Sequence, residues 1–275
     1  GDYFDNFYRE TRCEESYFDP YLFKNGEPVK YRGYCTDLFT DATIDFIESH
    51  QDEPFFAYLA TNAPHSPLQI ADEWADPFRK KGVNETHSRL YGMVENIDMN
   101  VGRILAKLDE LGLAESTLVV YTSDHGPCGS ARNPEAPQGQ RDRYNAGLRG
   151  IKGSVYEGGI RVPSFWRLPG TIRQGFDVDR VTHPIDVMPT FIEACGLRVP
   201  EAQLDGASLL PLLTERQSPD AWPDRKVFMQ WHRGDVPVPY RNYAVITQQF
   251  KLTRPGPTVL VPLGHVEHHP DEPYD

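Results

Sequence analysis

The segment that most constrains this chain is residues 118–126, which read Leu-Val-Val-Tyr-Thr-Ser-Asp-His-Gly. Its first part is apolar and β-branched, a pattern typical of a strand buried in a parallel sheet. Ligands of open α/β sheets bind beyond the carboxyl ends of the strands. The segment therefore predicts an α/β fold with Asp124 and His125 at its functional edge, as metal ligands or as an acid–base pair. The alternative is that Asp124 caps a turn and His125 lies on the surface.

Two further segments complete a predicted strand–helix–strand unit. Residues 55–60 are apolar and aromatic and predict a strand. Apolar residues at three- and four-residue steps over residues 88–111 predict a long helix, which Gly112 ends. Because a crossover of this kind normally joins parallel neighbours, we expect residues 55–60 and 118–122 to belong to one parallel sheet.

Shorter elements are predicted on both sides of this unit. A helix with an apolar stripe follows Thr36, which we expect to cap it. Residues 162–168 and 186–196 predict a strand and a helix, and alternating apolar residues near the C-terminal end predict antiparallel strands. We therefore expect a mostly parallel sheet flanked by helices in residues 1–222, and a small antiparallel α+β unit in residues 223–275.

Composition excludes several classes of partner. The chain has 275 residues, 39% of them hydrophobic, which is enough for a sizeable core. Its net charge of -12 argues against nucleic acid, whose binding needs a basic face. No apolar run is long enough to span a bilayer, so we expect no membrane segment. Residues 1–5 are acidic and aromatic rather than typical of a signal peptide, and we expect them to lie inside a longer protein.

Two other side chains are candidates for binding an anion. Lys152 lies between Gly150 and Gly153, and glycines allow a backbone to approach a ligand closely. His65 lies in a proline-bracketed loop and could donate to an anion or to a leaving group. Taken singly, each pattern favours a solvated surface residue over a ligand-binding one. Their order along the chain is more informative.

In that order, the motifs resemble the type I sulfatases of the alkaline phosphatase superfamily. The resemblance covers residues 1–251. The matching segments are residues 33–37 (GYCTD), 62–67 (NAPHSP), 122–126 (TSDHG), 150–153 (GIKG), 157–163 (EGGIRVP), 183–190 (HPIDVMPT) and 204–209 (LDGASL). It implies an alkaline phosphatase-like α/β fold and hydrolysis of sulfate esters.

The resemblance also implies roles for individual residues. Asp124 and His125 would be ligands of Ca²⁺, with Mg²⁺ as the alternative, and the ion would act as a Lewis acid and template. Lys152 and His65 would contact the sulfate, and Lys152 would assist the leaving oxygen. His232 would lie on the substrate side of the site. Glu157 and Arg161 would organise the lysine loop.

This chain departs from the family pattern in what it lacks. The family nucleophile is a formylglycine made within C-x-[PA]-x-R, and further metal ligands come from paired aspartates and a Lys-x-His segment. None of these is present. Cys128 is followed four residues later by Arg132, but Ser130 stands where Pro or Ala is required. We therefore expect the N-terminal part of the fold to be missing, an apolar sheet edge to be exposed, and this chain alone to be inactive.

Two other functions stay open. A phosphatase or phosphonate monoester hydrolase of the same superfamily would bind a tetrahedral anion of similar shape. An inactive fragment or a non-catalytic module that binds sulfated glycans is the second, although the charge of -12 disfavours it. The expected partner is a sulfated small molecule or a sulfated glycan. Family habit suggests a periplasmic, secreted or lysosomal location.

Overall fold

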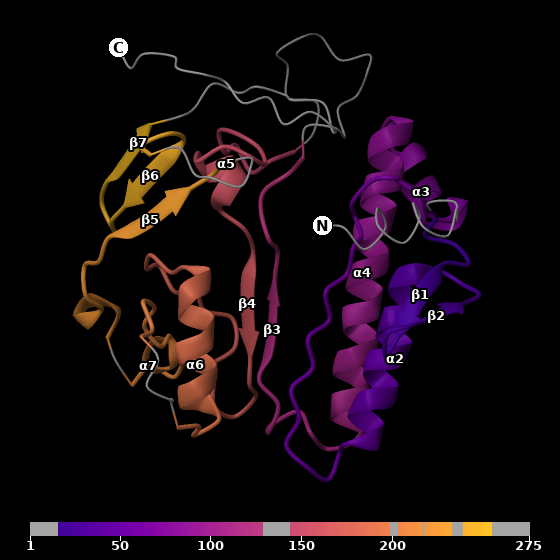
Figure 1. Cartoon of the computed structure of the whole chain (residues 1–275), viewed down its shortest axis with the longest axis horizontal. Coiled ribbons are helices and arrows are strands. Elements are labelled where there is room, and N and C mark those ends of the chain that lie inside the picture. Colours follow the sequence, from indigo (N-terminus) through magenta and orange to yellow (C-terminus); the bar gives the residue numbers. More distant parts are fainter. Residues whose placement is uncertain (1–15, 129–143, 199–202, 217, 233–238, 255–275) are drawn as a thin grey trace. The chain divides into compact units, whose positions relative to one another are not determined.

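The computed structural model describes residues 16–128, 144–198, 203–216, 218–232 and 239–254 (Figure 1). The chain divides into two compact units, of which the second begins at Leu118. None of the described helices is long and apolar enough to cross a membrane.

In its described residues, the first unit is built on three helices and a small hairpin. Strands β1 and β2 pair antiparallel, and α4 packs against both α2 and α3. The close approach of α3 and α4 depends on Gly92, because a Cβ there would lie 3.0 Å from the carbonyl of Trp74. The element bounds are β1 Tyr21–Lys24, β2 Glu27–Lys30, α2 Cys35–Ser49, α3 Asp72–Arg79 and α4 Glu85–Glu110. The core comprises Tyr17, Tyr34, Cys35, Ala63, Ile70, Ala75, Met93 and Ile97.

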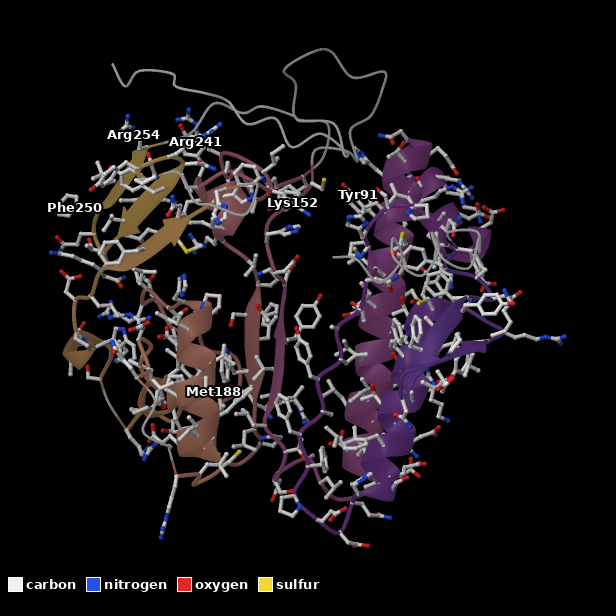
Figure 2. All side chains as sticks on the ribbon, viewed as in Figure 1. Tyr91, Lys152, Met188, Arg241, Phe250 and Arg254 are labelled. Carbon is white, nitrogen blue, oxygen red and sulfur yellow. The ribbon has the colours of Figure 1, made fainter. Side chains whose placement is uncertain are left out.

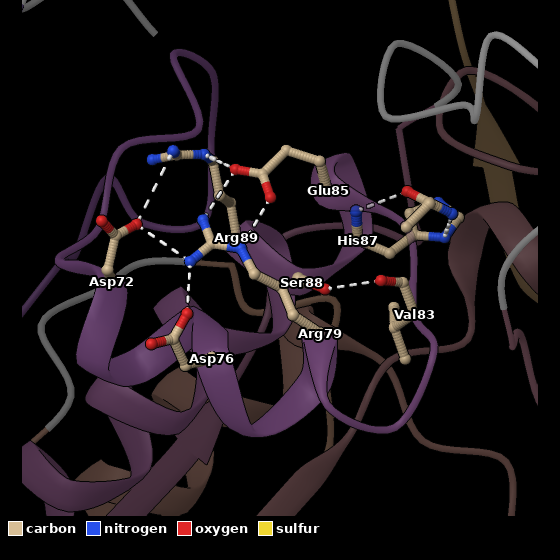
Figure 3. A network of polar contacts seen from close by, with 9 residues as sticks. Asp72, Asp76, Arg79, Val83, Glu85, His87, Ser88 and Arg89 are labelled. Carbon is tan, nitrogen blue, oxygen red and sulfur yellow. Dashed lines mark hydrogen bonds and ion pairs between the residues drawn. The ribbon is translucent and has the colours of Figure 1, made fainter.

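The long helix predicted over residues 88–111 is confirmed as α4, although it begins three residues earlier. Asn84 caps it by accepting a hydrogen bond from the backbone N–H of His87. Around its first turn, Glu85 binds Arg79 and Arg89, as Figure 3 shows. Gly112 follows the helix with a φ of +70°, which glycine adopts without strain. The start of α4 is thus marked in the sequence by its capping residue, Asn84, rather than by the first apolar residue of the helix.

The prediction that Thr36 caps α2 is wrong. The helix begins at Cys35 after Tyr34, and Thr36 is buried inside its first turn. The reason lies in the preceding chain, where the N–H of Cys35 donates to the carbonyl of Tyr17 at 2.8 Å. This tertiary contact, rather than a side-chain cap, sets the start of the helix.

The strand predicted at residues 55–60 is also wrong among the described residues, and the parallel sheet expected from it stays a prediction. The segment has no ladder partner within the part of the chain that the structure describes. Phe56 and Tyr58 are 70% and 83% exposed. A strand forms only where its backbone groups find partners, so an apolar sequence alone does not make one.

In the second unit the strand predicted at 118–122 is confirmed, but its described neighbour is antiparallel. Strand β3 (Val119–Thr122) pairs with β4 (Ser164–Arg167), so that Val119 faces Arg167 and Thr122 faces Ser164. The helix predicted from residue 186 is confirmed as a short 3₁₀ turn, Pro184–Asp186, followed by α6, Val187–Ala194. The remaining bounds are α5 Glu157–Ile160, α7 Leu210–Leu213 and a 3₁₀ turn at Pro219–Ala221.

The antiparallel strands predicted near the C-terminal end are confirmed. Strands β5 (Val227–Gln230), β6 (Tyr243–Ile246) and β7 (Lys251–Arg254) form one antiparallel sheet in that order. The domain boundary at residue 222 stays a prediction.

The buried carboxylate of Asp186 joins the motif segments 183–190 and 204–209. Asp186 is fully buried and forms a bidentate pair with Arg225. The same carboxylate accepts from the backbone N–H groups of His183 and Ala207 at 2.7 and 3.0 Å. Because all of these bonds satisfy one buried charge, we assign the two motif segments a structural role.

Candidate functional site

Asp124 and His125 lie directly after β3, where the sequence placed them. The carboxylate of Asp124 is 79% exposed, and its Oδ2 lies 3.0 Å from Nε2 of His125. Its Oδ1 accepts from the backbone N–H of His125, also at 3.0 Å. The two side chains therefore converge at one exposed point beyond the strand end.

The tautomer of His125 suits a cation at this point. Nδ1 lies 2.8 Å from the carbonyl oxygen of Gly126, which can only accept, so Nδ1 carries the hydrogen. In the neutral imidazole, Nε2 then carries no hydrogen, and its lone pair faces the Asp124 carboxylate. Two acceptors at this distance require a proton or a cation between them. The donor set thus fits part of a metal site, although the described residues contain no group of three or more such ligands.

Glycine contacts fix the strand end against the lysine loop. The N–H of Gly126 donates to the carbonyl of Gly159 at 2.9 Å, and the N–H of Lys152 donates to the carbonyl of Pro127 at 2.9 Å. A Cβ on Gly126 would lie 1.9 Å from the carbonyl oxygen of Gly158. Only a glycine permits this approach, so the loop holding Asp124 and the loop holding Lys152 form one backbone assembly.

The lysine loop itself is a tight turn. Gly150 and Gly153 have φ of +88° and +84°, and Ser154 donates through Oγ to the carbonyl of Ile151 at 2.8 Å. Lys152 is exposed beyond the end of β3, where Figure 2 labels it. Its ammonium makes no ion pair with any residue that the structure describes. A constrained backbone therefore presents an available cation.

His65 belongs to the first unit, where its loop rests on a buried tyrosine. The hydroxyl of Tyr17 lies 3.0 and 2.9 Å from the carbonyl oxygens of Asn62 and His65 and donates to them. Nδ1 of His65 lies 2.8 Å from the carbonyl of Ser66, which leaves Nε2 of this exposed side chain as its second functional atom. In both His65 and His125, therefore, Nδ1 donates to a main-chain carbonyl.

The cysteine beneath this loop is not a nucleophile. Cys35 is fully buried and lies 3.7 Å from Oδ1 of Asn62. Burial raises the pKa of its thiol to about 12, so it stays protonated at neutral pH. Burial likewise raises the pKa of Tyr17 and Tyr34 above their usual range, which keeps both hydroxyls as donors.

His232 is exposed and follows β5. The residue before it, Trp231, packs its ring against Gly153 of the lysine loop. No contact between described residues joins His232 itself to an anion site, so its substrate-side role stays a prediction.

Sequence reasoning missed two residues that contact the lysine loop and α5. Asn242 donates to the carbonyl of Gly153, and Lys251 pairs with Glu157. They lie 89 and 94 residues from these partners, and no local pattern marks them. Arg132, Ser130 and the rest of residues 129–143, including most of the C-x-x-x-R segment, lie outside the described residues.

Comparison with known families gives two matches. Residues 1–197 match the family described as Sulfatase, and residues 151–256 match N-sulphoglucosamine sulphohydrolase, C-terminal. The first match covers the segments that hold His65, Asp124, His125 and Lys152.

Two curated relatives are about one-third identical to this chain over the residues that align. An uncharacterized sulfatase YdeN of Escherichia coli (strain K12) is 32% identical over 78% of this chain and 37% of its own length. Steryl-sulfatase of Rattus norvegicus is 37% identical over 68% of this chain and 31% of its own length. The chain therefore spans about a third of the length of these relatives.

Solved structures agree with an α/β fold. The crystal structure of Ps i-CgsB in complex with k-i-k-neocarrahexaose matches with a TM-score of 0.75 and 28% identity, covering 92% of this chain and 54% of that one. Phosphonate monoester hydrolase SpPMH from Silicibacter pomeroyi matches with a TM-score of 0.57 and 20% identity, over 90% of this chain and 58% of that one, which shows the fold alone.

Proposed function

The chain belongs to the sulfatase family, and we propose that it supplies the anion-binding residues and part of the metal site of a sulfate-ester hydrolase. The observation that carries the proposal is the backbone assembly of the strand end and the lysine loop. On one exposed edge it holds a carboxylate, an imidazole and an ammonium that makes no ion pair with the described residues. A tetrahedral anion needs such a cation, and a metal needs such donors.

Asp124 and His125 would hold the cation, for which we propose Ca²⁺, with Mg²⁺ as the alternative. Oxygen from Asp124 suits either ion, and the tautomer of His125 leaves Nε2 available as a second donor. When bound, the cation supplies Lewis-acid polarisation of the sulfate oxygens.

Lys152 and His65 would act on the ester itself. The ammonium of Lys152 offsets the negative charge that develops on sulfate, and it can donate a proton to the leaving oxygen. Nε2 of His65 would donate to a second sulfate oxygen in the imidazolium form, because the hydrogen on Nδ1 is already directed at the carbonyl of Ser66. We keep His232 as a residue on the substrate side.

The nucleophile that the family uses, a formylglycine, has no matching cysteine in these 275 residues. We therefore propose that it is supplied from outside this segment and that the chain alone has negligible turnover. The expected mostly parallel sheet belongs to the same proposal. Phe56 and Tyr58, in the segment predicted as a strand, are exposed, as they would be in a strand that lacks its neighbours.

For the substrate, we propose a sulfated carbohydrate ahead of a sulfated small molecule. The solved relative in complex with k-i-k-neocarrahexaose supports this choice. A periplasmic, secreted or lysosomal location remains part of the proposal.

The test uses a polypeptide that carries this chain together with a C-x-[PA]-x-R segment, co-expressed with a formylglycine-generating enzyme. We expect turnover of p-nitrophenyl sulfate to fall at least a hundredfold in Lys152→Ala and in Asp124→Asn. The matched control is Lys80→Ala, which removes a surface lysine from the first unit. Equal activity in Lys152→Ala and the control would contradict the proposal. With this chain alone, turnover well above that of its Lys152→Ala variant would contradict the expected inactivity.

The second candidate is a phosphatase or phosphonate hydrolase, favoured by the fold shared with SpPMH. Assaying p-nitrophenyl phosphate and a phosphonate monoester beside the sulfate decides between them, because the preferred ester identifies the class. Binding of a sulfated glycan that survives loss of both His65 and Lys152 would instead indicate a non-catalytic binding module.

A further inference from the structure

The three-stranded sheet of the second unit touches the lysine loop at one of its ends. Asn242 immediately precedes β6, is only 6% exposed, and donates through Nδ2 to the carbonyl of Gly153 at 3.1 Å. The same Nδ2 lies 3.4 Å from the carbonyl of Trp231, and the carbonyl of Asn242 accepts from the N–H of Trp231 at 3.0 Å. One amide group thus ties the sheet to the residue that follows Lys152.

The backbone of Asn242 is adapted to this task. Its φ is +48°, in the left-handed region that asparagine tolerates better than most residues. In this conformation the side chain of Asn242, just before β6, lies close to the carbonyls of Gly153 and Trp231. Both hydrogens of its amide are directed at carbonyl oxygens, so a carboxylate in the same place would face two acceptors.

Trp231 adds an apolar contact to the same turn. Its ring lies against Gly153, where an added Cβ would be 3.4 Å from the indole. The positive φ of Gly153 and the absence of a side chain there allow the ring to cover the turn. The backbone on the C-terminal side of Lys152 is therefore covered and hydrogen-bonded by the sheet.

The opposite end of the sheet makes a second contact. Lys251 begins β7, and the strand register places it across from Ile246 and Val227, away from Trp231. Its Nζ lies 2.5 Å from Oε1 of Glu157 in α5, and the lysine side chain is only 19% exposed. Partial burial reduces solvent screening of this pair relative to a fully exposed one.

Both contacts hold the chain that follows Lys152, at two separate points. Asn242 holds residue 153, and Lys251 holds α5, whose Gly158 and Gly159 pack against the strand end of Asp124. A lysine side chain loses much rotamer entropy when it binds an anion, and a fixed backbone prevents a further loss of main-chain entropy. Holding the Lys152 turn in place therefore lowers the entropic cost of binding the anion.

We infer that Asn242 and Lys251 are positioning residues, through which the C-terminal sheet holds the Lys152 turn in the geometry that binds sulfate. The inference rests on the proposed function for the identity of the anion. The order of the turn can be measured without it.

The experiment follows hydrogen exchange and lysine reactivity in this chain. Asn242→Asp keeps size and left-handed backbone but loses the donors, and Asn242→Gly keeps the backbone and removes the side chain. The matched control is Asn25→Asp, at φ +55° in the turn between β1 and β2. Lys251→Gln breaks the second contact, and Lys251→Arg preserves a cation for Glu157.

We expect the amides of Lys152 and Ser154 to exchange at least tenfold faster in Asn242→Asp, Asn242→Gly and Lys251→Gln. They should stay near wild type in Asn25→Asp and Lys251→Arg. The ladder amides of β5 and β6 should keep their protection in every variant. Unchanged exchange at Lys152, or equal loss throughout the sheet, would overturn the inference, since the latter indicates a merely structural role.

A second measurement separates the inference from the proposed function. Acylation of Lys152 is followed by mass spectrometry with and without inorganic sulfate, in buffer containing calcium chloride. Sulfate should slow the reaction at least threefold in wild type and less than twofold in Asn242→Asp. No protection in wild type would count against sulfate as the anion, whereas equal protection in both proteins would count against Asn242 as a positioning residue.

Discussion

His65 and Lys152 both stand exposed on loops, but the two loops are held by opposite means. Beneath the His65 loop lies a fully buried side chain, Tyr17, whose hydroxyl donates to main-chain carbonyls. Around the Lys152 loop, glycines let carbonyl oxygens approach where a Cβ would lie, as at Gly126 and Gly158. The His65 loop is thus supported by a side chain beneath it, whereas the Lys152 loop depends on glycines that lack a side chain.

This difference decides which mutations each loop tolerates. A loop supported by a side chain is damaged by truncation, because buried carbonyls lose their donor. A loop supported by glycine contacts is damaged by a single added methyl group, because backbone on both sides cannot move aside. The following predictions test the comparison, beginning with the largest expected effect.

Gly126→Ala should be the most damaging change. Its Cβ would lie 1.9 Å from the carbonyl oxygen of Gly158, so the strand end and lysine loop must separate. We expect a loss of about 3 kcal/mol or more in the free energy of unfolding, measured in urea. The control is Gly102→Ala in α4, where no atom lies within 4 Å, and which should gain about 0.5–1 kcal/mol. A Gly126→Ala protein as stable as wild type would refute the glycine argument.

Cys35 should resist alkylation that labels Cys195. Burial raises the pKa of Cys35 to about 12, so its thiolate fraction at pH 8 is roughly a thousandfold below that of an unperturbed thiol. Cys195 is exposed and serves as the internal reference. Peptide mapping after iodoacetamide treatment gives both rates. Comparable rates would show that the core under the His65 loop opens readily.

Tyr17→Phe should loosen the His65 loop with a smaller cost. Removing the hydroxyl leaves the carbonyls of Asn62 and His65 without this donor, at about 1–3 kcal/mol. The control, Tyr58→Phe, alters a side chain that is 83% exposed and should be neutral. Urea unfolding gives the stability, and exchange of the His65 amide, which donates to Asn62, reports the loop. If both variants behave alike, the tyrosine does not anchor the loop.

The smallest effect should come from Glu85, away from both loops. Hydrogen bonds from Arg79, then from Arg89, lower its pKa to about 2. Because the folded pKa lies below the unfolded value, its contribution is present above about pH 4.5 and is lost as pH falls to about 2. Solvent exposure keeps the effect small. Stability measured from pH 5 to 2 should fall less in Glu85→Gln than in wild type, and identical slopes would contradict this assignment.

Local sequence predicted those elements whose formation needs few distant partners. Periodicity located α4, and alternation located β5 and β6. Residues 55–60 failed because a strand needs a neighbour, which apolar composition cannot supply. The prediction that Thr36 caps α2 failed because a contact with Tyr17, earlier in the chain, determines where α2 begins.

For the candidate site, the sequence by itself determined the chemical groups: Asp124 and His125 after an apolar strand, and Lys152 and His65 in loops marked by glycine or proline. Their family follows from the order of those motifs. Only the tertiary structure decided how the loops are held, through Tyr17 for His65 and through glycine contacts and Asn242 for Lys152. The physical reason is that reactive groups are encoded by residue type, whereas their support comes from hydrogen bonds and packing between residues far apart in the chain.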